Sequence, residues 1–238
     1  MLQNSRKNVI FVINTLFINL QMSREEQYNS EITEDVLVRQ ECLDPSSLSL
    51  LTYGRPGDIC MGFESGRLGN MAGGFHFELF VVNWYSSEHL YLCGEWSLNT
   101  GQCFEIQQYV RSIKSGSWAW RCSKSKYRND IRPDFASFRL QWMLWCVWRK
   151  SRLNEGFAQL LMSVPDDVVI VELVSKNDLV WSTYVDEAGI LHGGNAMGKV
   201  LTICRRHLLN GTTPNIDIDL LNASNIYILG NRIQFEKQ

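Results

Sequence analysis

The chain is organised around the stretch Trp84-Tyr85-Ser86-Ser87-Glu88-His89-Leu90-Tyr91, where two aromatic residues lead into two hydroxyls, an acid and an imidazole. Ser86 or Ser87 suits the N-cap of a helix, because its hydroxyl can accept from the unpaired N–H groups of the first turn. Glu88 would then lie in that turn, where the helix dipole favours a negative charge. Taken alone, Glu88 is interpreted as a dipole partner; as part of a wider site, it is a candidate catalytic acid.

The composition is that of an ordinary soluble globular protein. Of the 238 residues, 45% are hydrophobic and 20% charged. A net charge of −2 provides no global basic field for nonspecific binding of duplex nucleic acid, although a local basic region remains compatible with it. Eight tryptophans are many for this length. Most suit a core, and one or two could stack on a flat ligand.

The cysteines and histidines predict no metal site and no disulfide framework. The seven cysteines are odd in number and no pair is spaced as C-x-x-C, which favours reduced thiols in a cytoplasmic protein. The four histidines form no metal-ligand motif. We therefore expect no metal and no cofactor.

The N-terminus begins with a basic pair and a short apolar run. Arg6 and Lys7 precede residues 9–20, which resemble a signal peptide but contain two asparagines and precede no A-x-A-like cleavage site. The run is too short to span a bilayer, so we expect no membrane association. Translation from Met22 is the preferred explanation, with residues 1–21 outside the native protein.

The order of patterns predicts a single mainly helical α+β domain with a few short strands. This domain is expected over residues 58–212, between an N-terminal extension (1–57) and a C-terminal extension (213–238) packed on it. The expected elements are a strand at 77–84, a helix from Ser87 to about Trp96, helices at 100–113 and 117–128, a long helix capped by Asp134, helical turns at 157–162, a strand at 168–174, a helix from Met197 to Leu208 and a strand at 226–229.

Two further segments have the composition of ligand-binding loops. Residues 193–199 (Gly-Gly-Asn-Ala-Met-Gly-Lys) open a helix, where backbone N–H groups can approach a phosphate, yet the spacing differs from that of a P-loop. A plain turn is the alternative. Asp178 follows a buried strand and precedes Trp181, whose ring could stack on a base; an Asx turn and a core tryptophan are the alternatives. No G-x-S-x-G elbow and no Rossmann fingerprint occur.

Taken together, these motifs resemble the NADAR family, also called YbiA-like, over about residues 60–209. The residues that carry the resemblance, in chain order, are Phe63, Leu68-Gly69-Asn70-Met71, Tyr85-Ser86-Ser87-Glu88-His89-Leu90-Tyr91, Asp134, Arg139, Met143, Lys150, Val171-Glu172, Asp178, Trp181, Gly194-Asn195-Ala196-Met197-Gly198-Lys199 and Arg205. The sequence departs from the family pattern at Glu95, where members carry a lysine, and at Ser182, where they carry a glycine.

The resemblance implies an N-glycosidase without a cofactor. Its expected substrate is a small phosphorylated nucleoside-like molecule, a ribosylamino-pyrimidine phosphate, or an ADP-ribosylated guanine base in nucleic acid. Cleavage builds positive charge on the sugar, so a nearby carboxylate helps, and a donor must assist the departing base. Glu88 is expected to stabilise the sugar cation or activate water, and Asp178 to provide a second polar contact.

The remaining candidates are expected to bind substrate. Trp181 would stack on the base, the loop containing Asn195 would hold ribose or phosphate, and Arg67 or Arg139 would contact phosphate. A lysine adduct with the opened sugar, through Lys150 or Lys199, is the alternative mechanism. The full expected set of substrate-binding residues is Arg67, Tyr85, His89, Arg139, Lys150, Trp181, Gly194, Asn195, Gly198 and Lys199.

Two other functions remain open on the sequence. Glu95 in place of the family lysine favours a module that binds ADP-ribose or a nucleotide without cleaving it. Exposed tryptophans would instead favour an interaction protein. The oligomeric state is also open.

Overall fold

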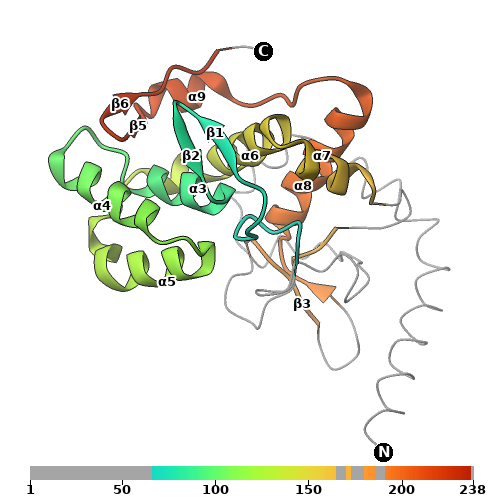
Figure 1. Cartoon of the computed structure of the whole chain (residues 1–238), viewed down its shortest axis with the longest axis horizontal. Coiled ribbons are helices and arrows are strands. Elements are labelled where there is room, and N and C mark those ends of the chain that lie inside the picture. Colours follow the sequence, from blue (N-terminus) through green and yellow to red (C-terminus); the bar gives the residue numbers. More distant parts are fainter. Residues whose placement is uncertain (1–65, 165–169, 173–179, 186–190, 237–238) are drawn as a thin grey trace, which may run out of the picture.

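The computed structural model describes residues 66–164, 170–172, 180–185 and 191–236. Over these residues the protein is mainly helical with short antiparallel strand pairs, which confirms the expected α+β class (Figure 1). The elements are β1 (Phe77–Leu79), β2 (Val82–Trp84), α3 (Ser87–Glu95), α4 (Gly101–Ser112), α5 (Gly116–Tyr127), the 3₁₀-helix η3 (Arg128–Asp130), α6 (Phe135–Leu153), α7 (Glu155–Met162), β3 (Tyr184–Val185), β4 (Leu191–His192), α8 (Ala196–Asn210), α9 (Ile218–Ala223), β5 (Tyr227–Ile228) and β6 (Asn231–Arg232).

Helix α6 lies at the centre of the fold because it is apolar on nearly all sides. Phe138, Trp142 and Trp148 are almost completely buried, and α3, α7, α8 and α9 all pack against the helix (Figure 1). Helix α3 comes closest at Gly94, where an added Cβ would overlap the indole nitrogen of Trp142. That nitrogen donates to the carbonyl of Tyr91 at 3.0 Å. Gly94 therefore allows the close packing of α3, which carries Glu88, on the central helix.

The segment 77–84, expected as one strand, is a hairpin of β1 and β2. Its register pairs Phe77 with Trp84 and Leu79 with Val82, so that Phe80 and Val81 form the turn. Both turn residues have φ near +60°, a conformation that β-branched residues such as valine rarely adopt. The single-strand prediction was wrong because the Asn, Asp or Gly residues that usually mark such a turn are missing.

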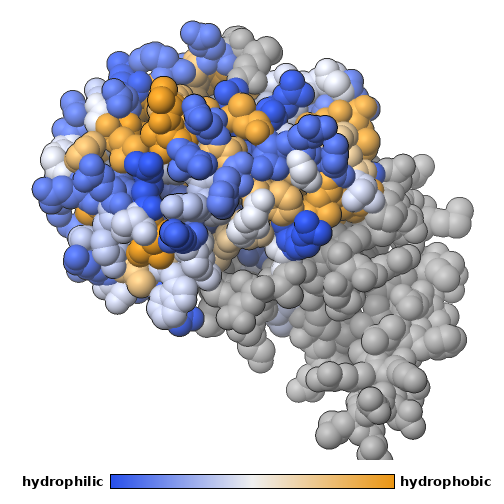
Figure 2. Space-filling model, in the orientation of Figure 1, coloured by the Kyte–Doolittle hydropathy of each residue, from blue (hydrophilic) through white to orange (hydrophobic). Residues whose placement is uncertain are grey.

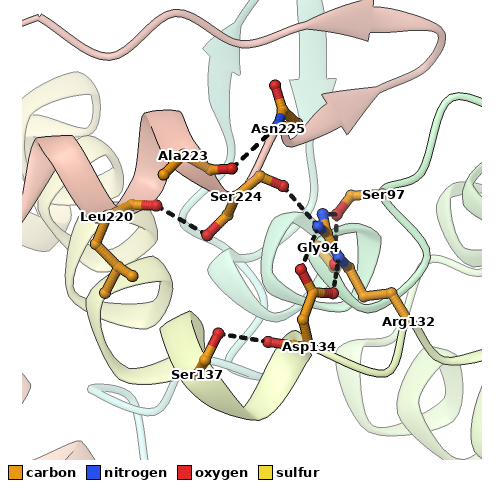
Figure 3. Close-up of polar contacts among 9 residues, drawn as sticks. All are labelled: Gly94, Ser97, Arg132, Asp134, Ser137, Leu220, Ala223, Ser224 and Asn225. Carbon is orange, nitrogen blue, oxygen red and sulfur yellow. Dashed lines mark hydrogen bonds and ion pairs between the residues drawn. The ribbon is translucent and has the colours of Figure 1, made fainter.

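A buried arginine connects three parts of the chain near the start of α6. Asp134 stands at the N-cap position, but its side chain makes no capping bond; Arg132 donates to its two carboxylate oxygens at 2.7 and 2.8 Å instead (Figure 3). Arg132 also donates to the hydroxyl of Ser97 at 2.9 Å and to the carbonyl of Ser224 at 2.6 Å. The expected side-chain cap was wrong because this buried guanidinium needs the carboxylate to compensate its charge.

The C-terminal residues complete the core around α6. Leu221, Ile226 and Ile228 are buried in the same hydrophobic cluster as the central helix. The ring of Phe235 packs edge-on against Trp142 and Trp145, with centroid distances of 6.2 and 5.2 Å. Helix α9 and the β5–β6 hairpin lie over α6 and α3 in Figure 1.

The helix expected from Met197 to Leu208 is confirmed as α8, whose first residues pack near residues 170–172. Most of the strand expected at 168–174 lies outside the described residues. Within the described ranges, no helix combines the length and the apolar character needed to cross a membrane.

Candidate functional site

The start of α3 is held by a loop residue, Asn70, instead of by a serine cap. Ser86 occupies the N-cap position with extended backbone, yet its hydroxyl makes no capping hydrogen bond. The N–H of Glu88 donates to the carbonyl of Asn70 at 3.0 Å, and the hydroxyl of Ser87 donates to the same carbonyl at 3.2 Å. The predicted helix start is therefore confirmed, whereas the predicted hydroxyl cap was wrong because both serines have other partners.

The carboxyl group of Glu88 is buried, with 2% of the residue exposed. The side-chain amide of Asn70 donates to its Oε2 atom. Burial, followed by the charge of Glu95, raises the pKa of Glu88 to about 8, although Lys124 opposes the shift. Glu88 is thus mainly protonated at pH 7. The effect of desolvation on the Glu88 pKa outweighs that of the helix dipole. The protonated carboxyl group can donate a proton, and the neighbouring amide of Asn70 can stabilise the carboxylate that remains.

His89 is a neutral supporting residue next to this acid. Its Nε2 atom lies 2.7 Å from the carbonyl of Ile113, so this nitrogen must carry the proton, and Nδ1 then accepts from the hydroxyl of Ser86 at 2.8 Å. Burial lowers the pKa of His89. The ring of Tyr85 packs edge-on against His89 at a centroid distance of 5.7 Å and is half-buried. His89 therefore ties α3 to the segment before α5.

Glu95 is paired with a lysine from another helix. The Nζ atom of Lys124 on α5 lies 2.6 Å from the Glu95 carboxylate. Burial nevertheless raises the pKa of Glu95, while Lys124 and Arg139 lower it in part. Because the charge of Lys124 also lowers the pKa of Glu88, a lysine of α5 acts electrostatically on the candidate acid.

Trp181 is brought against the helix that carries Glu88. Its ring lies edge-on to Tyr91, with a centroid distance of 5.7 Å. Tyr91 follows Glu88 by three residues, and such a pair lies on the same side of a helix. Trp181 therefore packs against the helix that carries Glu88, and its predicted role in binding the base stays a prediction. Asp178 lies outside the described residues.

Two basic candidates lie close to one phenylalanine ring. The guanidinium of exposed Arg67 and the Nζ atom of buried Lys150 each lie 5.5 Å from the ring centroid of Phe75. Lys150 Nζ also lies 3.8 Å from the ring centroid of Phe157 and donates to the carbonyl of Gly69 at 3.5 Å. Burial lowers the pKa of Lys150 to about 7. A substantial fraction of this amine is therefore neutral and nucleophilic at physiological pH.

The glycine-containing loop before α8 makes many of its polar contacts within the protein. The side chain of Asn195, which has φ +50°, donates to the carbonyl of Ile170 at 2.9 Å and accepts from the N–H of Glu172 at 3.0 Å. The N–H groups of Ala196 and Met197 donate to the carbonyls of residues 180 and 181. These backbone donors are already used, so a phosphate contact from this loop would need other groups.

The absence of a side chain on the glycines of this loop allows close packing. Gly194 is buried, and a Cβ on Gly198 would overlap both the carbonyl of Ile170 and the side chain of Asn195. Lys199, one residue further, is also buried. The loop thus holds the start of α8 against residues 170–172.

Three residues without an individual predicted role also belong to this neighbourhood. Asn70 contacts Glu88 directly, and the charges of Lys124 and Glu172 act on the Glu88 pKa. Asn70 and Glu172 occur in the family-like motifs, which was the available sequence signal. No signal pointed to Lys124, because its partner lies 29 residues away.

The described residues contain no group of three or more His, Cys, Asp or Glu side chains arranged to hold a metal ion. The five cysteines among them, Cys93, Cys103, Cys122, Cys146 and Cys204, are free thiols.

Comparison with known proteins identifies the fold. No family model matches the sequence, and no curated protein matches it. The structure is similar to the NMR structure of the E. coli protein YbiA, with a TM-score of 0.50 and 21% sequence identity, over 65% of this chain and 87% of that protein. The protein therefore has a YbiA-like fold.

Proposed function

We propose that the protein is an N-glycosidase that hydrolyses the ribose–nitrogen bond of a phosphorylated ribosylamino-pyrimidine or of an ADP-ribosylated guanine base. The observation that carries this proposal is the protonated, buried Glu88, held by Asn70 at the start of α3. Departure of a base needs a proton at its nitrogen, and an acid with a pKa near the working pH is suited to supply it.

In the proposed step, the C1′–N bond breaks and its electron pair stays on the base nitrogen. That nitrogen takes the proton from Glu88, and positive charge develops on the sugar. The Glu88 carboxylate then accepts a proton from water as the water oxygen bonds to C1′, which restores the acid. The amide of Asn70 stabilises the carboxylate between the two steps.

The other candidates are assigned to substrate binding. Trp181 is proposed to stack on the base, because its ring packs beside Tyr91 on the helix that carries Glu88. Asp178 would contact water, ribose or base, and Arg67 and Arg139 would contact phosphate. Tyr85 and His89 would support the acid, and Asn195, Gly194, Gly198 and Lys199 would shape the sugar-binding side of the site.

Lys150 supports the alternative mechanism for the same reaction. A neutral amine with a pKa of about 7 could add to C1′ of the opened sugar and form an imine as the base departs. Water would then hydrolyse the imine and release the sugar. Borohydride reduction during turnover would trap a covalent sugar on Lys150 by this route, and no adduct by the Glu88 route.

A module that binds ADP-ribose or a nucleotide without cleaving it is the second candidate function. Its support is the buried ion pair between Glu95 and Lys124, because Glu95 replaces a residue type that the resembled family carries. Calorimetry that detects nucleotide binding, with no product formed, would favour this function.

The decisive experiment incubates the purified protein separately with a ribosylaminopyrimidine phosphate and with an ADP-ribosylated guanine oligonucleotide. Mass spectrometry would detect the released base or ADP-ribose. We expect Glu88→Gln to reduce turnover by about 100- to 10,000-fold, the usual range for loss of a general acid, while the fold is retained. The matched control is Glu105→Gln, an exposed glutamate on α4, which should leave turnover unchanged. Full activity of Glu88→Gln would remove Glu88 from the catalytic role.

A further inference from the structure

A concentration of positive charge lies outside the candidate site, in and around α5. Residues 111–128 contain no Asp or Glu, in a chain whose net charge is −2. The basic residues in this range are Arg111, Lys114, Arg121, Lys124, Lys126 and Arg128. A local basic region in a mildly acidic protein points to an anionic partner.

An exposed tryptophan and two arginines share one face of this region. Trp118, Arg121, Ser125 and Arg128 follow one another at spacings of three and four residues, so they lie on one side of the helix, and all four are exposed. Trp118 is 55% exposed, and the guanidinium of Arg121 lies 5.1 Å from its ring centroid. A large aromatic ring with so much exposed surface is unusual for the outside of a domain.

A second pairing of cation and aromatic rings lies where α5 meets α4. The Nζ atom of Lys126 lies 4.9 Å from the ring centroids of both Tyr109 and Tyr127. By contrast, Lys124 is occupied by its ion pair with Glu95. We use "the α5 surface" for Trp118, Arg121, Lys126 and Arg128.

This combination of chemistry fits a single nucleic-acid strand. Aromatic rings stack on unpaired bases, while arginine and lysine follow the phosphates. A duplex hides its bases from such stacking. The surface over α4 and α5 is mostly pale and blue in Figure 2, whereas orange residues gather nearer the β1–β2 and β5–β6 hairpins. Its exposed aromatic rings, Phe104, Trp118 and Trp120, therefore lie in a largely polar surface.

We propose that the α5 surface binds single-stranded nucleic acid. Helix α5 begins beside the start of α3, because a Cβ on Gly116 would press against the carbonyl of Met71 and the hydroxyl of Ser86. A nucleic-acid strand bound on α5 would therefore pass the helix that carries Glu88. Binding does not depend on the proposed hydrolysis, since the surface contains none of the candidate catalytic groups.

The test is fluorescence anisotropy of the full chain with a labelled, unmodified single-stranded DNA of mixed sequence, about 15 nucleotides long to match typical site sizes. We expect binding that weakens steeply between about 50 and 200 mM salt. Trp118→Ala should weaken binding about tenfold, through loss of base stacking. Arg121→Gln combined with Arg128→Gln should reduce the slope of log affinity against log salt by about 1.4, as expected for two phosphate contacts.

Matched controls lie on the other side of the molecule, on α8. Leu209→Ala removes an exposed apolar side chain and Arg206→Gln an exposed charge, and neither should change binding. Circular dichroism would check that each variant is folded. Glu88→Gln should bind the oligonucleotide like the unaltered protein, so a failure of hydrolysis and a failure of binding are distinguishable.

Three results would overturn the proposal. The first is no binding at low salt, and the second is equal weakening by the α8 controls. The third is equally tight binding, lost in the same α5 variants, to vesicles with anionic lipid or to an acidic peptide. That last result would assign the surface to a membrane or a protein partner instead.

Discussion

The start of α3 and the outer face of α5 place their side chains in opposite environments. Glu88 and His89 are buried, whereas Trp118, Arg121 and Arg128 are exposed, although Gly116 at the start of α5 lies against Ser86 at the start of α3. Burial changes the protonation of the first group, whereas the side chains of the second are exposed to water. The comparison teaches that access to water separates a site suited to chemistry from one suited to docking.

The largest expected effect is the pH dependence of stability caused by Glu88. Its pKa is about 8 in the folded protein and 4.5 as a model group. Between these pH values the folded state keeps a proton that the unfolded state has lost, so stability falls as pH rises from about 4.5 to about 8. The full difference corresponds to at most about 5 kcal/mol. Urea unfolding across this range should show the fall in the unaltered protein and its loss in Glu88→Gln.

Lys150 should give the opposite dependence of stability on pH when the same urea unfolding is extended to higher pH. Its pKa is about 7 when folded and 10.5 as a model group, so the unfolded state binds the extra proton and stability rises with pH between these values. Lys150→Met should remove this rise and leave the fall below pH 8. If neither variant changed the dependence of stability on pH, that result would contradict the burial of the Glu88 carboxyl and the Lys150 amine.

Two arginines, one buried and one exposed, test how far burial determines the cost of losing a charge. Arg132 is buried with three polar partners, whereas Arg128 is exposed. Arg132→Gln should cost about 3 kcal/mol, because the buried hydroxyl of Ser97 and the buried carbonyl of Ser224 lose their donor. Arg128→Gln should change the unfolding free energy little. Denaturant titration of both variants measures the contrast, and equal losses would mean that burial does not distinguish them.

The smallest effect is expected for stability at the α5 surface itself. Arg121→Gln should change the free energy of unfolding by no more than about 0.5 kcal/mol, because exposed charges contribute little to folding. The same variant should still weaken oligonucleotide binding. A large loss of stability here would mean that the residue serves the fold and that its binding phenotype is indirect.

Local sequence patterns determined most of the described helices, although α9 was not expected from the sequence. The positions of α3, α4, α5, α6 and α8 agree with the helices expected from local patterns, although the expected side-chain caps of α3 and α6 do not form. The same local rules placed Glu88 in the first turn of α3. They failed at Phe80 and Val81, where the hairpin turn lacks its usual residues.

Tertiary structure alone decided what these residues can do. Glu88 is protonated at neutral pH because burial in the folded chain removes it from water and the charge of Glu95 lies nearby. Glu95 received Lys124 as its partner, and Arg132 received Ser97 and Ser224, from pairings that no local pattern specified. The physical reason is that helix formation is governed by neighbours in sequence, whereas desolvation and charge pairing depend on residues that meet only in the folded chain.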